Sequence, residues 1–395
     1  MAVPTLDDVI ANGVAGQRVF VRADLNVPVK DGQVGDDTRI RATIPTLRKL
    51  LDAGARVVLA SHLGRPKGKV DPKYTLAPVA ERLGKLLGTP VAFAPECIGA
   101  ETESAVANLA EGSVLLLENL RFHAEEEKND PTFAASLAQL ADVYVNDAFG
   151  TAHRAHASTV GMVSLVKEVG AGDLLCAELE HLRRILDPAR PFLCLLGGAK
   201  VSDKITVLEA MVKRADVVCI GGAMAYTFLR AQGKPIGTSL VEAERDVDAR
   251  RVLDVAKQSG HELLLPVDHV VAQRIEAGAP HRVVSEIPDG WMGLDIGPET
   301  ARLYADRAAR AKTIFWNGPM GVFEIDAFAR GTEAVARAVA DSAAVSVVGG
   351  GDSLAAVNRI GVADRITHCS TGGGASLEFV EGRTLPGVAA LERSA

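Results

Sequence analysis

Short apolar runs rich in β-branched residues recur along the chain. Each run is followed by a loop containing glycine, proline or asparagine, and then by a helical stretch. Uninterrupted apolar runs that alternate with helices are typical of parallel strands covered on both faces. The pattern therefore predicts an α/β protein with doubly wound parallel sheets. The runs are RVFV (18–21), RVVLAS (56–61), SVLLLE (113–118), DVYVN (142–146), FLCLLGG (192–198), DVVCIGG (216–222), TIFWNG (313–318) and VSVVGGG (345–351).

The length of 395 residues exceeds the size at which one core stops growing, so about two domains are expected. Between residues 170 and 190, four leucines lie on one face of a predicted helix that ends before Pro188. We interpret it as a hinge helix joining two Rossmann-like domains across a cleft, although a packed surface helix of one domain explains the same pattern. The predicted divisions are residues 1–172, a connecting helix at 173–187, and residues 188–379.

Composition narrows the class of protein. A net charge of −7 opposes nucleic-acid binding, and no apolar stretch is long enough to span a bilayer. The opening residues lack the pattern of a signal peptide, so a cytoplasmic globular protein is expected. The five cysteines are scattered without CxxC spacing; we interpret them as small buried side chains and expect neither a disulfide framework nor a zinc site.

Cationic side chains follow several strands in the first half of the chain. In open α/β sheets, ligands bind beyond the carboxyl ends of the strands. Because arginine matches carboxylate and phosphate oxygens, the set predicts a site for a small polyanion. Any one of these cations alone is explained as a surface residue, and Asp24 and Asn26 are explained equally well as turn caps. The candidate cations are Arg22, Arg39, His62, Arg65, Arg121, His153, Arg154 and His156, and Asp24 and Asn26 accompany Arg22 in the same loop.

Glycine-rich loops take the corresponding positions in the second half. Glycine permits positive φ and close backbone approach, so these loops predict a phosphate cradle on the nucleotide side. Lys200 and Lys204 are suited to neutralise phosphates, Glu324 to accept ribose hydroxyls and Asp352 to hold magnesium. Asp352 is also placed to cap the following helix, and Glu324 and Lys204, taken singly, read as solvated residues. The loops are GGAK (197–200), GGAMA (221–225), NGPMG (317–321), GGGDS (349–353) and TGGGAS (371–376).

Familiar nucleotide motifs do not occur. The sequence contains no GxxxxGK[ST] P-loop, no HRD or DFG motif, and no GxGxxG after its first strand. The missing glycine fingerprint opposes an NAD-dependent dehydrogenase.

Several long motifs, read in order, resemble the phosphoglycerate kinase family almost from end to end. They are VRADLNVP, SHLGRP, LENLRFHAEEEKND, NDAFGTAHRAHAS, LGGAKVSDKI, GLDIGP, WNGPMGVFE, GGGDS and STGGGASLEF. The resemblance implies a monomeric glycolytic enzyme that interconverts 1,3-bisphosphoglycerate and ADP with 3-phosphoglycerate and ATP, using magnesium.

The resemblance also implies roles for individual positions. It places Arg39, Lys200 and Gly372, Gly373 and Gly374 around the transferring phosphoryl group. The substrate residues are Asp24, Asn26, Arg39, His62, Arg65, Arg121 and Arg154. The nucleotide residues are Lys200, Lys204, Gly221, Gly222, Gly293, Asn317, Glu324, Gly350, Gly351, Asp352 and Ser353, with Asp352 on the metal. Residues from about 380 to 395 return to the N-terminal domain, and we interpret the acidic residues 125–127 as a solvated helix start.

A non-catalytic protein that binds a phosphorylated metabolite is the alternative. Retention of Arg39, Lys200 and Asp352 opposes it, and an ADP/ATP-coupled assay distinguishes the two.

Overall fold

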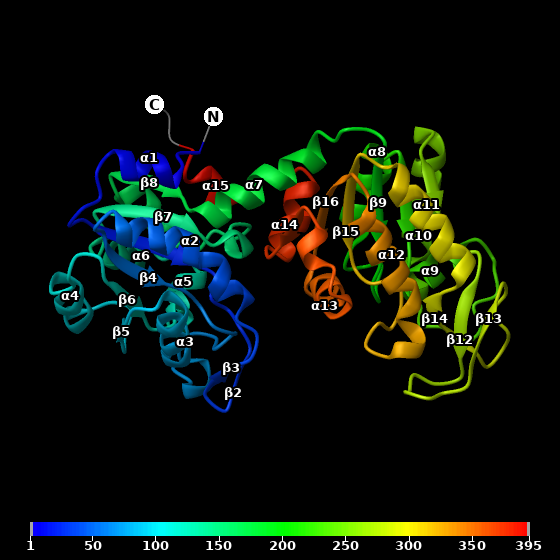
Figure 1. Cartoon of the computed structure of the whole chain (residues 1–395), viewed down its shortest axis with the longest axis horizontal. Helices are drawn as coiled ribbons and strands as arrows, with labels where there is room; N and C mark the ends of the chain where they lie inside the picture. Colours follow the sequence, from blue (N-terminus) through cyan, green and yellow to red (C-terminus); the bar gives the residue numbers. More distant parts are fainter. Residues whose placement is uncertain (1–2, 393–395) are drawn as a thin grey trace. The chain divides into compact units, whose positions relative to one another are not determined.

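The structure, a computed structural model, describes residues 3–392 of the chain. The chain forms two compact units, which the sequence colours of Figure 1 help to follow. Unit 1 comprises Met1–Glu180 together with Thr384–Ala395, and unit 2 comprises His181–Arg383. Because Glu180 lies within helix α7 (Asp173–Leu186), the chain leaves unit 1 along this helix and returns to it after Arg383.

Unit 1 is built on a parallel sheet of six strands in the order β5-β6-β4-β1-β7-β8. The central strands consist almost entirely of buried side chains, as expected when helices cover both faces of a sheet. In the register of β1, Phe20 lies opposite Val58 on one neighbour and Tyr144 on the other. The strands are β1 (Arg18–Ala23), β4 (Arg56–Ala60), β5 (Val91–Ala94), β6 (Val114–Leu117), β7 (Val143–Asp147) and β8 (Glu168–Ala171), and a small hairpin adds β2 (Val29–Lys30) and β3 (Gln33–Val34).

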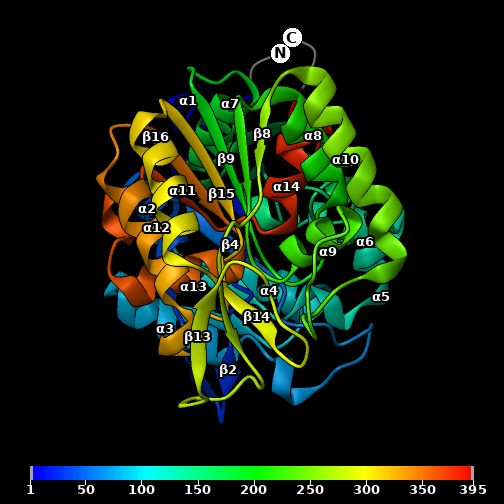
Figure 2. The same ribbon diagram turned by 90° about the vertical axis from the view of Figure 1, so that its right-hand side faces the viewer.

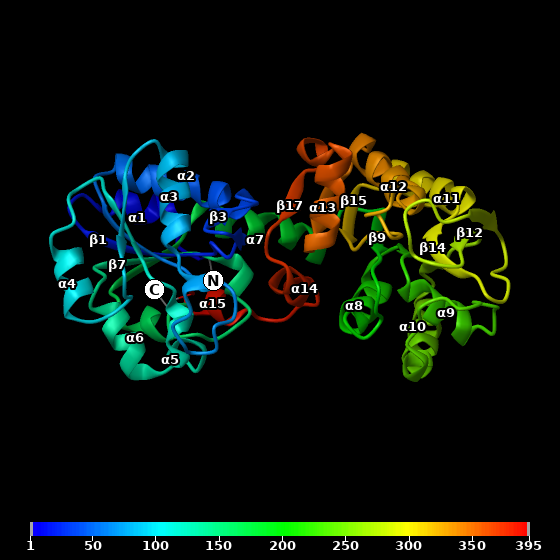
Figure 3. The same ribbon diagram turned by 90° about the horizontal axis from the view of Figure 1, so that it is seen from below.

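Helices cover both faces of this sheet, with α2 and α3 on one face and α5 and α6 on the other (Figure 3). Helix α2 buries Ile40, Leu47 and Leu50, whose spacing places them on one helical face. Helix α6 begins where the Asp130 carboxylate accepts hydrogen bonds from two backbone N–H groups, an N-cap that fixes its start. The helices are α1 (Leu6–Ala11), α2 (Thr38–Asp52), α3 (Ala77–Leu87), α4 (Ala100–Ala107), α5 (Ala124–Glu127), α6 (Pro131–Ala138) and α15 (Pro386–Ala389).

Unit 2 contains a second six-stranded parallel sheet, in the order β11-β10-β9-β15-β16-β17. The strand order reverses between β9 and β15, and such a switch point is where open α/β sheets bind ligands. A separate antiparallel sheet has the order β13-β12-β14. The strands are β9 (Phe192–Leu196), β10 (Val217–Ile220), β11 (Glu262–Leu264), β12 (His269–Ala272), β13 (His281–Val284), β14 (Met292–Ile296), β15 (Thr313–Asn317), β16 (Val345–Gly349) and β17 (His368–Ser370).

The helices of unit 2 also form two layers. Figure 2 shows α11 and α12 on one side of β9 and β15, and α8 and α10 on the other. Tyr304 of α11 is fully buried, and its hydroxyl donates to the carbonyl of Ile220 at the end of β10, which ties the helix to the sheet. The helices are α8 (Ile205–Arg214), α9 (Met224–Ala231), α10 (Asp246–Ser259), α11 (Pro298–Arg310), α12 (Arg330–Asp341), α13 (Gly351–Ile360) and α14 (Gly374–Val380).

These two parallel sheets confirm the predicted α/β class. Each apolar run named in the sequence coincides with an observed strand, from β1 to β16. Strands β5, β8, β11 and β17 were not predicted, and all four lie at the edges of the sheets.

The segment after Arg383 is anchored in unit 1. Gly387 N donates to the carbonyl of Ala152 at 2.8 Å, and Leu391 is fully buried. In Figure 1 the red α15 lies beside the green ribbon of unit 1. A segment made after unit 2 therefore completes the packing of unit 1.

Two further findings concern the expected class of protein. Within residues 3–392, no helix combines the length and apolar character needed to cross a bilayer. The cysteines carry free thiols, of which Cys97, Cys194 and Cys219 are buried and Cys176 and Cys369 are partly exposed.

Candidate active site

Three strand-end loops of unit 1 meet at Gly64. The side-chain oxygen of Asn26, after β1, accepts a hydrogen bond from Gly64 N at 2.8 Å. Arg121, after β6, donates from Nη1 to the Gly64 carbonyl at 3.0 Å. Gly64 itself follows β4 and has φ of +62°, and a Cβ there would collide with the ring of Tyr74. The structure thus brings together three of the loops that the sequence assigned to one anion site.

Arg39 lies in the first turn of α2 and points back to the loop after β1. Its Nη1 donates to both carboxylate oxygens of Asp24 at 2.9 Å, and its side chain is 32% exposed. Asp24 Oδ1 also accepts from the backbone N–H of Asn26 at 3.2 Å. The turn-capping interpretation of Asp24 is therefore correct in this state, and the same carboxylate fixes the direction of Arg39.

His62 is a buried neutral imidazole. Its Nδ1 lies 3.3 Å from Nη2 of Arg22, and because a guanidinium only donates, Nδ1 accepts and the ring proton is on Nε2. Burial lowers the pKa of His62 well below its usual value, and the charges of Arg22 and Arg121 add to this effect. His62 is suited to donate one hydrogen bond to a ligand without contributing charge.

The remaining predicted cations differ in exposure. Arg65 and Arg154 are exposed, whereas Arg121 is only 7% exposed. Burial, with the nearby charge of Arg22, lowers the pKa of Arg121. Arg22 is fully buried and is bonded to Ser158 and His62, so it positions other residues instead of presenting its charge to a ligand.

The interpretation of residues 125–127 as a solvated helix start is wrong for Glu126, which is fully buried. Its two oxygens accept hydrogen bonds from the Oγ and backbone N of Ser158, at 2.5 and 2.9 Å. Ser158 Oγ also accepts from Nε of Arg22 at 2.8 Å. Glu126 therefore supplies the negative charge in a buried network beneath the cationic loops.

Unit 1 should lose stability in mild acid because burial keeps His62 and His156 in the neutral form. Burial lowers the pKa of His156 to about 3, with Arg22 as the next cause. Below about pH 6.5 these histidines are protonated in the unfolded chain but not in the folded chain. The free energy of unfolding therefore falls as pH falls, by up to about 1.4 kcal/mol per pH unit for each proton. Urea unfolding at about pH 7.5 and pH 5, monitored by hydrogen exchange in peptides from unit 1, measures this loss. The free energy of unfolding should depend less on pH in His156→Gln than in the unchanged chain. Equal slopes would contradict this.

In unit 2, Lys204 sits at the switch point between β9 and β15. Its Nζ donates to the carbonyl of Gly197 at 2.7 Å, to the carbonyl of Asn317 at 3.0 Å and to Oδ1 of Asn317 at 2.5 Å. Burial lowers the pKa of Lys204 to about 8. The solvated interpretation of Lys204 is therefore wrong, since its ammonium ties the ends of two strands together.

Asn317 and Ser353 extend this arrangement. The amide nitrogen of Asn317 donates to the carbonyl of Gly349 at 2.8 Å, and the buried hydroxyl of Ser353 accepts from Gly318 N at 2.6 Å. These bonds hold the loops after β15 and β16 side by side. Gly350 and Gly351 lie between them and form the start of α13.

A cavity of about 280 Å³ opens beside these loops. Its lining combines apolar side chains with glycines and two carboxylates, as expected for a small-molecule site. A Cβ at Gly222 would lie 2.5 Å from Gly198 N, and one at Gly293 would collide with Tyr226, so both positions require glycine. The predicted nucleotide residues in its lining are Gly222, Gly293, Glu324 and Asp352.

The other predicted residues lie around the cavity or at its edges. Lys200 and Glu324 are exposed, and Gly221 is buried against Met320. Asp352 is exposed in the first turn of α13 and makes no capping hydrogen bond, so the capping interpretation is wrong. Gly372, Gly373 and Gly374 lead into α14, where Gly372 N donates to Ser370 Oγ at 3.3 Å.

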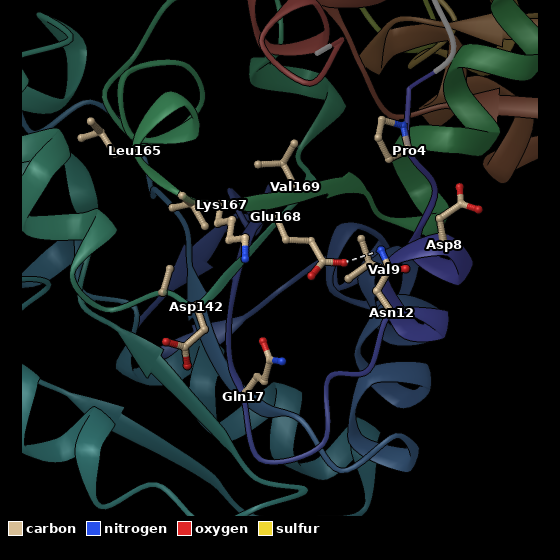
Figure 4. A pocket seen from close by; sticks show the side chains of 12 residues that line it. Pro4, Asp8, Val9, Asn12, Gln17, Asp142, Leu165, Lys167, Glu168 and Val169 are labelled. Carbon is tan, nitrogen blue, oxygen red and sulfur yellow. Dashed lines mark hydrogen bonds between the residues drawn. The ribbon is translucent and has the colours of Figure 1, made fainter. Parts of the chain in front are cut away.

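A second cavity, of about 900 Å³, lies elsewhere on unit 1 (Figure 4). Asp142 and Glu168 on its wall stand at the amino ends of β7 and β8, and Glu168 accepts a hydrogen bond from Asn12 at 2.8 Å. Because the strand-end loops described above lie at the carboxyl ends, this cavity is separate from the candidate site.

Comparisons with known proteins identify the family of this chain. A family model for phosphoglycerate kinase matches residues 6–383. The chain is 58% identical over 394 residues to the phosphoglycerate kinase of Moorella thermoacetica, with 99% of each chain covered. The chain belongs to the phosphoglycerate kinase family. It is also 54% identical over 396 residues to the phosphoglycerate kinase of Chloroherpeton thalassium, again covering 99% of each chain.

Solved structures of phosphoglycerate kinases share the fold. The structure from Coxiella burnetii has a TM-score of 0.87 at 42% identity, covering 96% of this chain and 97% of that one. The structure from Pyrococcus horikoshii has a TM-score of 0.83 at 35% identity, covering 98% of both. Family membership makes this chain a phosphotransferase with a carboxyl group as acceptor, active in glycolysis.

The supporting residues Ser158, Tyr74 and Met320 were assigned no role from the sequence, although Ser158 and Met320 lie within quoted motifs. They contact Glu126, Gly64 and Gly221. Their roles depend on contacts between segments far apart in the chain.

Proposed function

We propose that unit 1 holds 3-phosphoglycerate or 1,3-bisphosphoglycerate and that unit 2 holds ATP or ADP. The observation that supports this assignment is the junction at Gly64, where the loops after three strands meet and where Arg121 donates to the Gly64 carbonyl. Exposed Arg65 and Arg154 offer full charges to phosphate and carboxylate oxygens, while Asp24 and Asn26 offer acceptors for a hydroxyl. The substrate residues are thus Asp24, Asn26, Arg39, His62, Arg65, Arg121 and Arg154.

On unit 2 we assign the cavity of about 280 Å³ to the nucleotide. The cavity is lined by Gly222, Gly293 and apolar side chains, which suits the flat base, and the exposed Glu324 carboxylate is suited to ribose hydroxyls. Lys204 acts mainly through its charge, because protein oxygens already accept from its ammonium. A phosphate oxygen that replaced one of them would gain a strong hydrogen bond.

The donor set of unit 2 fits magnesium. Asp352 presents an exposed carboxylate that is not used in capping, and magnesium in nucleotide sites takes one or two carboxylates together with phosphate oxygens and water. We propose that Asp352 holds the ion, which when bound neutralises charge on the phosphates.

The protein's part in the reaction is positioning and electrostatic stabilisation. An acyl phosphate is already reactive, so no covalent nucleophile is needed, and the donor and acceptor oxygens must be held in line. We assign the stabilisation of charge on the transferring group to Arg39, which Asp24 directs, and to the exposed Lys200. We assign the N–H groups of Gly372, Gly373 and Gly374 to the same task.

Direct transfer requires the reacting atoms to approach within about 3–3.5 Å. We therefore expect a hinge motion that brings the two bound substrates together and excludes water, which limits hydrolysis of the acyl phosphate. Small-angle X-ray scattering should detect a smaller radius of gyration when 3-phosphoglycerate and MgATP are both present than with either alone. An unchanged radius would contradict the closure.

Phosphorus NMR tests the function directly. The chain mixed with MgATP and 3-phosphoglycerate should produce ADP and a new acyl phosphate resonance. A non-catalytic binding protein would shift the 3-phosphoglycerate signal without producing either.

Arg65→Ala should raise the KM for 3-phosphoglycerate more than the KM for ATP, which would test the assignment of the substrates to the two units. We further propose that the enzyme acts as a cytoplasmic monomer, without nucleic-acid or membrane partners.

A further inference from the structure

A cluster of three different metal-ligating side chains lies on unit 1 outside the residues assigned to the substrate. Glu96 and Cys97 belong to the loop before α4, and His123 precedes α5. One ligand atom from each residue can be chosen so that all three lie within 4.8 Å of one another. The sequence does not mark this cluster, because Cys97 and His123 come from separate segments and form no CxxC or similar motif.

The burial of the cluster is graded from the protein interior to the surface. Cys97 is fully buried, whereas the side chains of His123 and Glu96 are 26% and 44% exposed. A cation from solvent would therefore meet the imidazole and the carboxylate first and the sulfur last. His123 Nε2 and Glu96 Oε1 are already 2.8 Å apart, and the His123 ring packs on Phe133 with a centroid distance of 5.1 Å.

The combination of donors selects the type of metal. Sulfur, imidazole nitrogen and carboxylate oxygen are the ligands of Zn²⁺, whereas Mg²⁺ and Ca²⁺ prefer oxygen alone. Tetrahedral zinc, with bonds of about 2.0–2.3 Å, holds its ligand atoms roughly 3.3–3.7 Å apart. The two partly exposed side chains would rotate to bring the ligand atoms from the observed spacing to this one.

We propose that Glu96, Cys97 and His123 form a three-ligand Zn²⁺ site whose fourth position is open to water. As the metal binds, the thiol of Cys97 gives its proton to solvent and a Zn–S bond forms in place of one bond from zinc to water. The site is separate from the magnesium that we assign to Asp352 on unit 2.

The position of His123 gives such a site a consequence for the enzyme. His123 directly follows the turn Leu120–Phe122, which contains Arg121, and directly precedes α5, which contains Glu126. A bound metal would link this segment to the loop before α4. Zinc should therefore restrain the part of unit 1 that positions Arg121.

Titration of the full-length chain with Zn²⁺ and with Co²⁺ tests the proposal. The buffer should contain millimolar Mg²⁺ and a phosphine reductant, so that neither oxygen sites nor added thiols compete. We expect one Zn²⁺ per chain, and a near-ultraviolet sulfur-to-cobalt charge-transfer band with Co²⁺. Cys97→Ser should abolish this band, and His123→Gln and Glu96→Gln should each weaken Zn²⁺ binding at least about tenfold.

Cys176→Ser is the matched control, because it removes a partly exposed thiol of unit 1 that lies outside the cluster. This variant should bind Zn²⁺ as tightly as the unchanged chain. Glu96→Gln and His123→Gln alter partly exposed side chains, so they keep the test valid if Cys97→Ser fails to fold. Binding that survives all three cluster variants, or the absence of both stoichiometric Zn²⁺ and a charge-transfer band, would overturn the proposal and leave Glu96 and His123 as an ordinary polar pair over a buried thiol.

Discussion

Arg39→Ala should lower kcat by about 10²–10³-fold while the chain stays folded, since one preorganised donor to a developing charge is typically worth that much. The Asp24 carboxylate holds the Arg39 guanidinium in place before substrate arrives, so little reorganisation is needed during transfer. Its charge is wanted mainly in the transition state, and kcat should therefore fall more than the affinity for 3-phosphoglycerate.

Steady-state kinetics in an ADP/ATP-coupled assay measures this effect. Arg41→Ala is a matched control on the same helix, because the Arg41 side chain is 57% exposed and pairs only with Asp37 among the interactions described. It should retain nearly full activity. If Arg39→Ala also retains it, Arg39 has no part in stabilising the transferring group.

Glu126→Gln should destabilise unit 1 by about 1.5–3 kcal/mol, the usual contribution of a hydrogen bond to a charged group, because the Glu126 carboxylate accepts two hydrogen bonds from Ser158. Glu126 is fully buried, and the fully buried Arg22 is linked to it through Ser158. The substitution preserves shape but removes the charge that offsets the guanidinium. Urea unfolding monitored by far-ultraviolet circular dichroism gives the change in the free energy of unfolding.

Glu125→Gln provides the comparison one residue away. Glu125 is exposed in the same short helix, so its substitution should change stability by less than about 0.5 kcal/mol. Equal unfolding midpoints for the two variants would mean that the buried network does not depend on the charge of Glu126.

The central strands were predictable from sequence, and the edge strands were not. β4 and β15 are buried along almost their whole length, so their apolar runs are continuous. β5 and β11 are only partly buried because they have a neighbour on one side alone. They are also only four and three residues long, VAFA and ELL, which is too short for a pattern to identify a strand.

The residues of the candidate site were predictable as types, but their contacts were not. A cation after a strand is visible in one sequence, as with Arg121, because the strand and the loop are local. The burial of Glu126 could not be predicted, because it depends on contact with Ser158, which comes from a different loop. Lys204 was misjudged for the same reason, since its partners Gly197 and Asn317 belong to two different strand ends.

The return of the chain to unit 1 has a consequence for biosynthesis. A ribosome makes all of His181–Arg383 before it makes the segment that carries Gly387 and Leu391. Nascent unit 2 is continuous and can acquire its native contacts during translation, whereas nascent unit 1 must wait with Ala152 uncovered. The half made first should therefore be the half that matures last.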